Sequence, residues 1–483
     1  MKKNIGINAV LNTTKTLMSM IFPLITYPYA LRVLGVTNIG KVSYVASIVS
    51  YFTLFAMLGV NSYAVREGSR LRDNSEKLTK FSNEVFSINL LFTLISSSFL
   101  ILSAFVIPNF SGYRILFLIQ CFTIFFTALS IEWINTIYED YLFITLRSLI
   151  IQILSLVLLF LFVKKESDFY VYSAIQVITN GFVCVSNWVN LRKYIKLRVT
   201  LNFQFFKHIK PLLILFSNSI AVSIYVNFDT TMIGWIRGDY DVGLYTASTK
   251  IYHIMKSLMM AIYTVFLPRL SYYAGFDDNK AYKALYSKLW SYVSLILLPA
   301  AIGLFSVSKE VILLLGGENY LDSAPVLKIL SFSLIFAIFS GLVTTCLNVV
   351  HKREKENLIA TLLSASVNCS LNFIAIPLWG PIGAAITTLI SELFVLIFTL
   401  FRIKNKEQYI DFMFVGRNLK DAFIGCILIV ILSCLIHYRI DNIFLALILT
   451  VVGSVAFYFG FMFITKNEIC IGFFKNIIKK LHK

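Results

Sequence analysis

The sequence predicts an all-α polytopic membrane protein with about 14 transmembrane helices. Of its 483 residues, 58% are hydrophobic and only 14% are charged, and the mean hydropathy is +0.78. Soluble globular proteins carry about 25% charged residues, so this composition excludes a soluble fold. Two further observations support the prediction: apolar runs of membrane-spanning length recur along the chain, and basic residues gather between alternate runs.

Fourteen apolar runs reach the length of roughly 20 residues that a helix needs to cross a bilayer. The loops between them are too short to hold a soluble domain, and no phosphate-binding GxxxxGK[ST] motif occurs, which argues against an ATP-driven pump. The predicted spans are 8–31, 42–63, 85–107, 114–137, 141–163, 169–190, 211–236, 243–267, 285–307, 326–350, 357–377, 382–401, 421–437 and 442–464.

The basic residues sort to one side of these fourteen spans. With the N-terminus in the cytoplasm, 30 of the 43 Lys and Arg residues fall in cytoplasmic segments and 8 in outer loops, with Lys288 and Arg114 at span ends counted with those loops, and 5 lie within spans. Because Lys and Arg favour cytoplasmic loops, both termini are predicted to be cytoplasmic. The net charge of +18 then reflects topology, and its spread over many short loops argues against nucleic-acid binding.

Two turns of the sequence repeat each other at an offset of 203 residues. LGVTNIGKVSYVAS follows the first span and RGDYDVGLYTAST follows the seventh, so that Gly35 and Gly40 match Gly238 and Gly243. Six spans separate the copies, which gives both the same orientation in the membrane. We expect two pseudo-symmetric six-helix bundles, residues 1–200 and 201–402, and two additional helices with a basic tail, residues 403–483.

A few charged residues lie inside the predicted spans. A charge at the bilayer centre costs about 2.5–3.5 kcal/mol, so such residues usually face the protein interior or a water-filled cavity. Asp229 and Lys250 lie on consecutive spans at the same depth, roughly 11 Å below the outer boundary of the membrane, and can therefore pair. The intramembrane acids are Glu132, Asp229 and Glu392, and the bases are Lys15, Lys250 and Lys256, with Arg147 and Lys328 near span ends.

Polar residues also recur at helical spacing within two spans. Asn12 and Lys15 share one face of the first span, and Asn368 and Asn372 share one face of the eleventh. Such residues line a cavity or form hydrogen bonds between helices, and the spacing alone leaves both interpretations open.

Three stretches carry a resemblance to a known family. FPLITYPYALRVLGVTNIGKVSYVASIVSYFTLFAMLGVNSYAVREGSR, with Pro28, Arg32, Gly35 and Gly40, resembles the opening of the bacterial polysaccharide repeat-unit (O-antigen-type) flippases. These belong to the multidrug/oligosaccharidyl-lipid/polysaccharide exporter superfamily. FDTTMIGWIRGDYDVGLYTAS resembles their seventh and eighth helices, and NFIAIPLWGPIGAAITTLISE their eleventh and twelfth.

The resemblance implies a transporter of the bacterial cytoplasmic (inner) membrane and no enzyme. It implies two bundles around a central cavity, working by alternating access. The implied substrate is an undecaprenyl-pyrophosphate-linked oligosaccharide carried from the inner to the outer leaflet for capsule, O-antigen or exopolysaccharide synthesis. The expected partners are membrane lipids, a polysaccharide polymerase and glycosyltransferases. No cofactor, metal site or catalytic residue is expected, while coupling to H⁺ or Na⁺ stays open.

The charged and polar residues within spans are candidates for binding this substrate. A pyrophosphate is recognised by Lys and Arg, and sugars are recognised by hydrogen-bonding side chains. We expect the pyrophosphate at Lys15, Lys250, Lys256 and Arg32, sugar contacts at Asn12, Asn368, Asn372 and Glu392, and a coupling or charge-pair role for Asp229, Lys250 and Glu132.

Two alternative substrates stay open: an organic cation, as in a multidrug antiporter of the same superfamily, and a peptidoglycan lipid-linked precursor. The bases inside the spans, which at least equal the acids in number, favour an anion over a cation. A polytopic glycosyltransferase or polymerase is disfavoured, because such enzymes usually carry their acidic catalytic residues on a substantial loop and no loop between the predicted spans is long enough.

Overall fold

The computed structural model describes residues 5–201, 204–276, 278–472 and 475, and all regular elements in these residues are helices. The chain divides into two compact units, Met1–Gly243 and Leu244–Lys483, and each is described by itself. The predicted bundle limits at 200 and 402 differ from this division and stay a prediction. The two chain ends, predicted to be cytoplasmic, lie outside the described residues.

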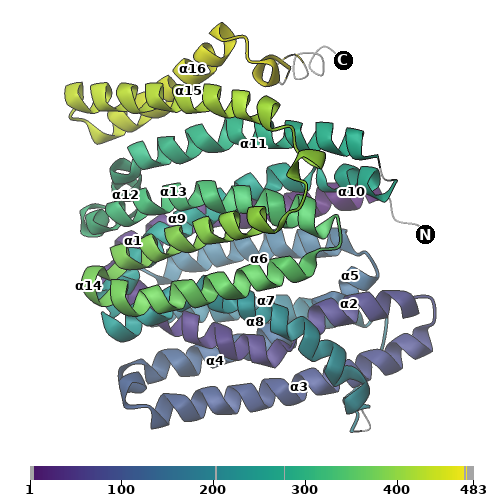
Figure 1. Ribbon diagram of the computed structural model, residues 1–483. Helices are drawn as coiled ribbons and strands as arrows, with labels where there is room; N and C mark the ends of the chain where they lie inside the picture. Colours follow the sequence, from purple (N-terminus) through teal and green to yellow (C-terminus); the bar gives the residue numbers. More distant parts are fainter. Residues whose placement is uncertain (1–4, 202–203, 277, 473–474, 476–483) are drawn as a thin grey trace. The chain divides into compact units, whose positions relative to one another are not determined.

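The first unit is built on α1, which packs against α3, α4, α6 and α8 (Figure 1). A buried apolar cluster that includes Phe81, Trp133 and Phe216 joins the short helices α2 and α5 to α3 and α8. The helices are α1 (Ile5–Met57), α2 (Val60–Leu71), α3 (Ser75–Val106), α4 (Arg114–Ala128), α5 (Glu132–Ile137), α6 (Tyr141–Phe162), α7 (Phe169–Leu191) and α8 (Phe205–Ile236), with α9 (Asp239–Thr264) crossing into the second unit.

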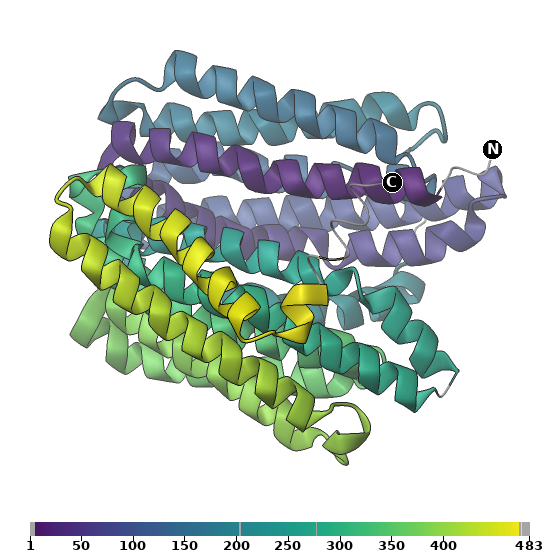
Figure 2. The same ribbon diagram turned by 90° about the horizontal axis from the view of Figure 1, so that it is seen from above.

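The second unit is built on α11, which packs against α13 and α15. The last two helices, α15 and α16, form the yellow hairpin of Figure 2, and Ala422, Tyr458 and Met462 bury its inner face with Leu295 of α11. The helices are α10 (Leu267–Gly275), α11 (Asn279–Ser306), α12 (Ser308–Gly316), α13 (Ala324–Gly341) with its π-helical continuation (Leu342–Val349), α14 (Glu354–Arg402), α15 (Phe412–Arg439) and α16 (Ile443–Ile464).

The fold confirms the predicted polytopic all-α class. In the described residues, eleven helical segments are long and apolar enough to cross a membrane. Two of them each hold two predicted spans, because α1 bends at Gly35 and α14 bends at Gly380, where φ is 73° and 54°. Together with α8, a 32-residue helix over the predicted span 211–236, the segments match the fourteen predicted spans.

The repeated turn has a glycine with positive φ at the matching position of both copies. Gly35 and Gly238 have φ values of +73° and +96°, in the region that glycine adopts at little cost and other residues rarely occupy. The sequence match at an offset of 203 residues therefore reflects a shared conformational requirement of the two turns.

The two copies also contact each other through glycine. A Cβ added to Gly40 would lie 1.8 Å from the carbonyl oxygen of Asp239, and one added to Gly243 would lie 2.1 Å from that of Val36. Val36 and Asp239 are themselves 203 residues apart. The contact is therefore reciprocal: each copy presses a glycine against the same backbone position of the other.

Two predicted spans of the first unit are interrupted near one another. The helix after Gly35 ends at Met57, where Leu58 and Gly59 have positive φ before α2 begins. The predicted span 114–137 is divided into α4 and α5 by Ile131, with φ +47°. Since α2 packs on α5, the two interruptions are brought together, and Glu132 begins the helix at one of them.

Candidate functional site

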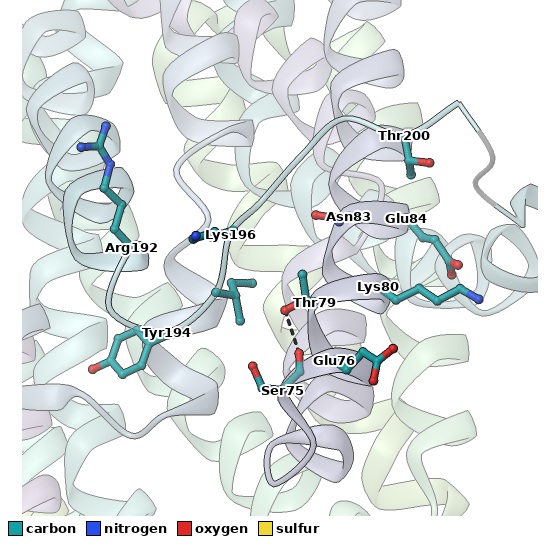
Figure 3. Close-up of a pocket in the computed structure, with 11 residues that line it drawn as sticks. Ser75, Glu76, Thr79, Lys80, Asn83, Glu84, Arg192, Tyr194, Lys196 and Thr200 are labelled. Atoms are coloured by element: carbon teal, nitrogen blue, oxygen red, sulfur yellow. Dashed lines mark hydrogen bonds between the residues drawn. The ribbon is translucent and has the colours of Figure 1, made fainter.

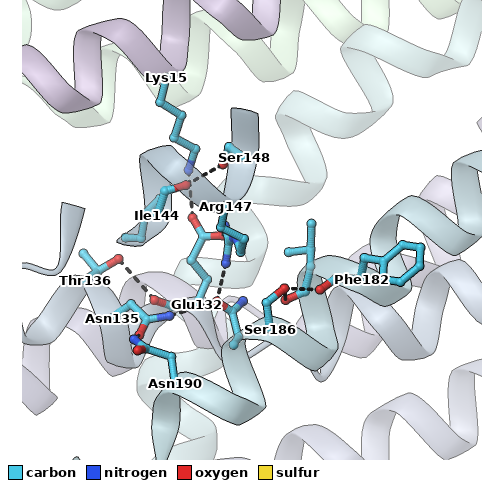
Figure 4. A network of polar contacts seen from close by, with 12 residues as sticks. Lys15, Glu132, Asn135, Thr136, Ile144, Arg147, Ser148, Phe182, Ser186 and Asn190 are labelled. Atoms are coloured by element: carbon cyan, nitrogen blue, oxygen red, sulfur yellow. Dashed lines mark hydrogen bonds and ion pairs between the residues drawn. The ribbon is translucent and has the colours of Figure 1, made fainter. Parts of the chain in front are cut away.

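A charged cluster of the first unit joins three helices through one carboxylate (Figure 4). Lys15 Nζ of α1 donates to Glu132 Oε1 over 2.9 Å, and Arg147 Nη2 of α6 donates to Glu132 Oε2 over 2.7 Å. The side chains of Lys15 and Glu132 are about one-third exposed, whereas that of Arg147 is buried. Glu132 is therefore held by one accessible cation and one buried cation.

Hydrogen bonds continue from this cluster through a series of amides. The Arg147 guanidinium and the Asn135 amide both donate to Asn187 Oδ1. Asn190 Nδ2 donates to Asn135 Oδ1 over 2.8 Å and to Asp140 Oδ2 over 3.2 Å. The polar series thus links α5, α6 and α7 and fixes the guanidinium behind the Glu132 carboxylate.

Glu132 also lines a cavity of about 340 Å³ at the two helix interruptions. The rest of the lining is mixed, with amide and hydroxyl groups beside apolar side chains. It comprises Met57, Asn61, Val65, Phe126, Thr127, Ser130, Trp133, Thr136, Asn180 and Val183. A hydrogen-bond donor that enters this cavity would meet the Glu132 carboxylate of the charged cluster.

A wider cavity of about 840 Å³ lies between the start of α3 and the segment after α7 (Figure 3). Lys80 and Lys196 line it together with Glu76, so its charges are mixed. Tyr194 at its edge donates to Asp140 over 2.6 Å. Burial and this neighbouring carboxylate raise the pKa of the Tyr194 phenol, which stays protonated at neutral pH.

A second ion pair lies in the second unit. Lys256 Nζ of α9 donates to Glu392 Oε1 of α14 over 2.7 Å, and the Tyr252 hydroxyl donates to the same oxygen over 3.1 Å. The Glu392 side chain is 5% exposed and that of Lys256 is 25% exposed. The structure thus brings together a residue expected to contact pyrophosphate and one expected to contact sugar.

Asn368 and Asn372 lie between the two arms of α14. Asn372 Nδ2 donates to Asn368 Oδ1 over 3.1 Å, and the Thr387 hydroxyl contacts both amides. All three side chains are buried. In this conformation the two asparagines hold one span of the hairpin to the next.

The remaining candidate residues are spread over both units. Asn12 and Arg32 are exposed on α1, Asp229 is buried in α8, and Lys250 is exposed on α9. Asp229 and Lys250 belong to different compact units, so their pairing stays a prediction.

The sequence predicts no role for Arg147 or for the amides behind it. Arg147 lies near the end of a predicted span, and Glu132 is predicted to act with Asp229 and Lys250, whereas in the structure Glu132 binds Lys15 and Arg147. One available signal was the spacing of Asn187 and Asn190, three residues apart on one helix face. It would have marked α7 as a polar partner for a neighbouring charge.

Family models and curated relatives place the chain among proteins of surface-glycan synthesis. The model described as polysaccharide biosynthesis protein matches residues 5–274, and the MatE model matches residues 214–374. A relative from Escherichia coli (strain K12), named "Putative O-antigen transporter", is 24% identical over 80% of this chain and 94% of its own. The "Capsular polysaccharide biosynthesis protein CapF" of Staphylococcus aureus is 25% identical over 74% of this chain and 89% of its own.

Solved structures share the fold. The structure titled "Lipid II flippase MurJ, inward closed conformation" has a TM-score of 0.78 at 18% identity, covering 95% of this chain and 99% of the other. An inward-facing multidrug resistance MATE family transporter has a TM-score of 0.55 at 14% identity, covering 79% and 98%. At these identities the likeness concerns the fold, and the family follows from the sequence model that matches more than half of the chain. The chain belongs to the polysaccharide biosynthesis protein family.

Proposed function

We propose that the protein is a flippase that moves an undecaprenyl-pyrophosphate-linked oligosaccharide repeat unit from the inner to the outer leaflet of the cytoplasmic membrane. The observation that carries the proposal is the presence of lysines within membrane spans, Lys15 and Lys256, each held by a carboxylate. A cation at this depth costs free energy, and binding the anionic head of the substrate would explain why lysines are present there. Family membership and the curated relatives support a role in capsule, O-antigen or exopolysaccharide synthesis.

The proposed binding roles divide by chemistry. Cationic side chains take the pyrophosphate, while amides and a carboxylate take sugar hydroxyls. Exposed side chains at Asn12, Arg32 and Lys250 support direct contact. The buried Asn368 and Asn372 reach sugar only if the two arms of α14 separate. The pyrophosphate residues are Lys15, Lys250, Lys256 and Arg32, and the sugar residues are Asn12, Asn368, Asn372 and Glu392.

We propose that Asp229, Lys250 and Glu132 exchange charge partners during alternating access. The Glu132 carboxylate supports it by already binding cations from two helices. An H⁺ or Na⁺ gradient is the proposed driving force. The test imposes an H⁺ gradient or an Na⁺ gradient on proteoliposomes and measures the rate of flipping. If this rate is the same with either gradient as with none, the coupling is rejected.

The decisive experiment uses purified protein in liposomes with a fluorescent undecaprenyl-pyrophosphate-linked oligosaccharide. Exposure of the label to an impermeant quencher reports flipping. The wild-type protein is expected to accelerate it, and Lys15→Ala and Lys250→Ala are expected to slow it. Full flipping by both variants would reject the cationic binding role.

Two other substrates fit the similar proteins. The MatE match over residues 214–374 and the fold shared with a multidrug resistance MATE family transporter fit an organic cation. The fold shared with a lipid II flippase fits a peptidoglycan precursor. Increased drug sensitivity of a deletion strain would select the first, and lethality on depletion the second. A deletion strain that stays viable, keeps its normal drug sensitivity and loses its surface polysaccharide would support the proposed substrate.

A further inference from the structure

The charged cluster around Glu132 has the form of an occupied anion site. A carboxylate and a phosphate both accept paired hydrogen bonds from cationic donors, and Glu132 accepts one from Lys15 and one from Arg147. The three side chains carry a net charge of one positive unit. If the Glu132 carboxylate moved away, Lys15 and Arg147 would be left around a position that another anionic group could occupy.

The cluster also has more donors than it uses. Among the described residues, Arg147 Nε, Asn187 Nδ2 and Trp133 Nε1 are buried and have no hydrogen-bond partner. Trp133 lines the 340 Å³ cavity beside Glu132. Buried donors without partners are costly and are uncommon in native proteins. Arg147 and Asn187 belong to the hydrogen-bonded series behind Glu132, and an oxyanion there would supply acceptors for their two donors.

The cluster lies at a depth that a substrate from the cytoplasm would reach first. In the predicted topology, spans 8–31 and 141–163 begin at the cytoplasmic boundary and span 114–137 ends there. Lys15, Arg147 and Glu132 are five to seven residues from those ends, which places them about 8–11 Å inside. The interrupted helices at Leu58 and Ile131 open the cavity at the same level.

We propose that Lys15 and Arg147 form an anion-binding site in which the Glu132 carboxylate is an internal substitute for the substrate, and that a pyrophosphate group displaces it. The displaced Glu132 then lies in the cavity, free to accept from a sugar hydroxyl or to take up a proton. Binding is thereby linked to a rearrangement of α5 against α1 and α6. This inference rests on the proposed function only for the identity of the lipid that carries the pyrophosphate.

The test measures binding of inorganic pyrophosphate to the full chain by calorimetry in phosphatidylcholine nanodiscs. Glu132→Gln removes the competing charge and keeps the side-chain size, so its pyrophosphate affinity is expected to rise about tenfold. Lys15→Gln is expected to lose binding. Glu139→Gln is the matched control, because Glu139 binds Arg72 at 2.7 Å outside the cluster, and its affinity should equal that of the wild type.

The outcomes separate this inference from the proposed function. Unchanged or weaker pyrophosphate binding by a folded Glu132→Gln variant would overturn the internal-substitute role, even if oligosaccharide flipping is intact. Tighter binding would support the site even if no oligosaccharide is flipped, in which case only the proposed function fails. Repeating the titration in phosphatidylglycerol nanodiscs distinguishes the source of the anion. If phosphatidylglycerol weakens pyrophosphate binding by competition, the site belongs to lipid headgroups and the substrate assignment is overturned. Equal pyrophosphate affinity in the two kinds of nanodisc would support the substrate assignment.

Discussion

Gly40 and Gly243 lie against each other's turn: each glycine meets the carbonyl oxygen of the residue four positions before the other. The two contacts, Gly40 with Asp239 and Gly243 with Val36, are related by the 203-residue offset of the repeat. A contact that is equivalent in both directions is what a pseudo-two-fold axis produces. The duplicated turn is therefore both the signature of the repeat and a point where its two copies meet.

Replacing Gly40 with Ala should destabilise the protein. The new Cβ would lie 1.8 Å from a backbone oxygen, so the helices must separate, and overpacking of this kind costs about 1–3 kcal/mol. Thermal unfolding of the purified protein measures the loss. Gly303→Ala is the control, because a Cβ at this helical position meets no atom within 4 Å. Equal melting temperatures for the two variants would contradict the close contact.

Removing Lys256 should expose the cost of a buried carboxylate. Lys256→Met leaves Glu392, 5% exposed, without its cation, and breaking such a pair costs about 3 kcal/mol. Adding Glu392→Gln should restore much of the stability, because no charge is then buried. Unfolding free energies by steric trapping measure the difference between the single and double variants.

A surface ion pair of the same unit provides the comparison. Arg402 makes two hydrogen bonds with Glu356, of 2.7 and 2.9 Å, and its side chain is 53% exposed. Arg402→Met should lose less than about 1 kcal/mol, as exposed pairs do. If Arg402→Met and Lys256→Met lose equal stability, burial does not govern the effect.

Asn372→Ala separates packing from substrate contact. Its amide is buried and bonded to Asn368 and Thr387, so the substitution should cost about 1–3 kcal/mol. Asn12, proposed for the same sugar role, is exposed on α1, and Asn12→Ala should slow flipping with no change in melting temperature. A stable Asn372→Ala variant with slow flipping would instead assign Asn372 directly to sugar binding.

The predicted topology can be checked from outside the cell. Single cysteines at Lys165 and Lys309 should react with an impermeant maleimide in intact cells, since both lie in predicted outer loops. Cysteines at Lys196 and Lys352, in predicted cytoplasmic loops, should react only after the membrane is opened. A reversed pattern would overturn the cytoplasmic placement of both termini.

The sequence by itself determined the class of the protein, its spans and its repeat. Hydropathy and loop charge are properties of consecutive residues, so 20-residue runs and the distribution of Lys and Arg report the fourteen crossings without knowledge of any contact. The positive φ values of Gly35 and Gly238 are also local, which is why the repeat appears as matching glycines. Locally determined features of this kind are readable from one chain.

The partners of the charges were decided only by the tertiary structure. Glu132 binds Lys15 across 117 residues and Glu392 binds Lys256 across 136. The sequence gives the depth of each charge but not which helix faces it. That choice depends on how long helices rotate and pack, and in the first unit on the interruptions at Leu58 and Ile131 that place α2 against α5. Bilayer depth narrows the candidates for a partner, and helix packing selects among them.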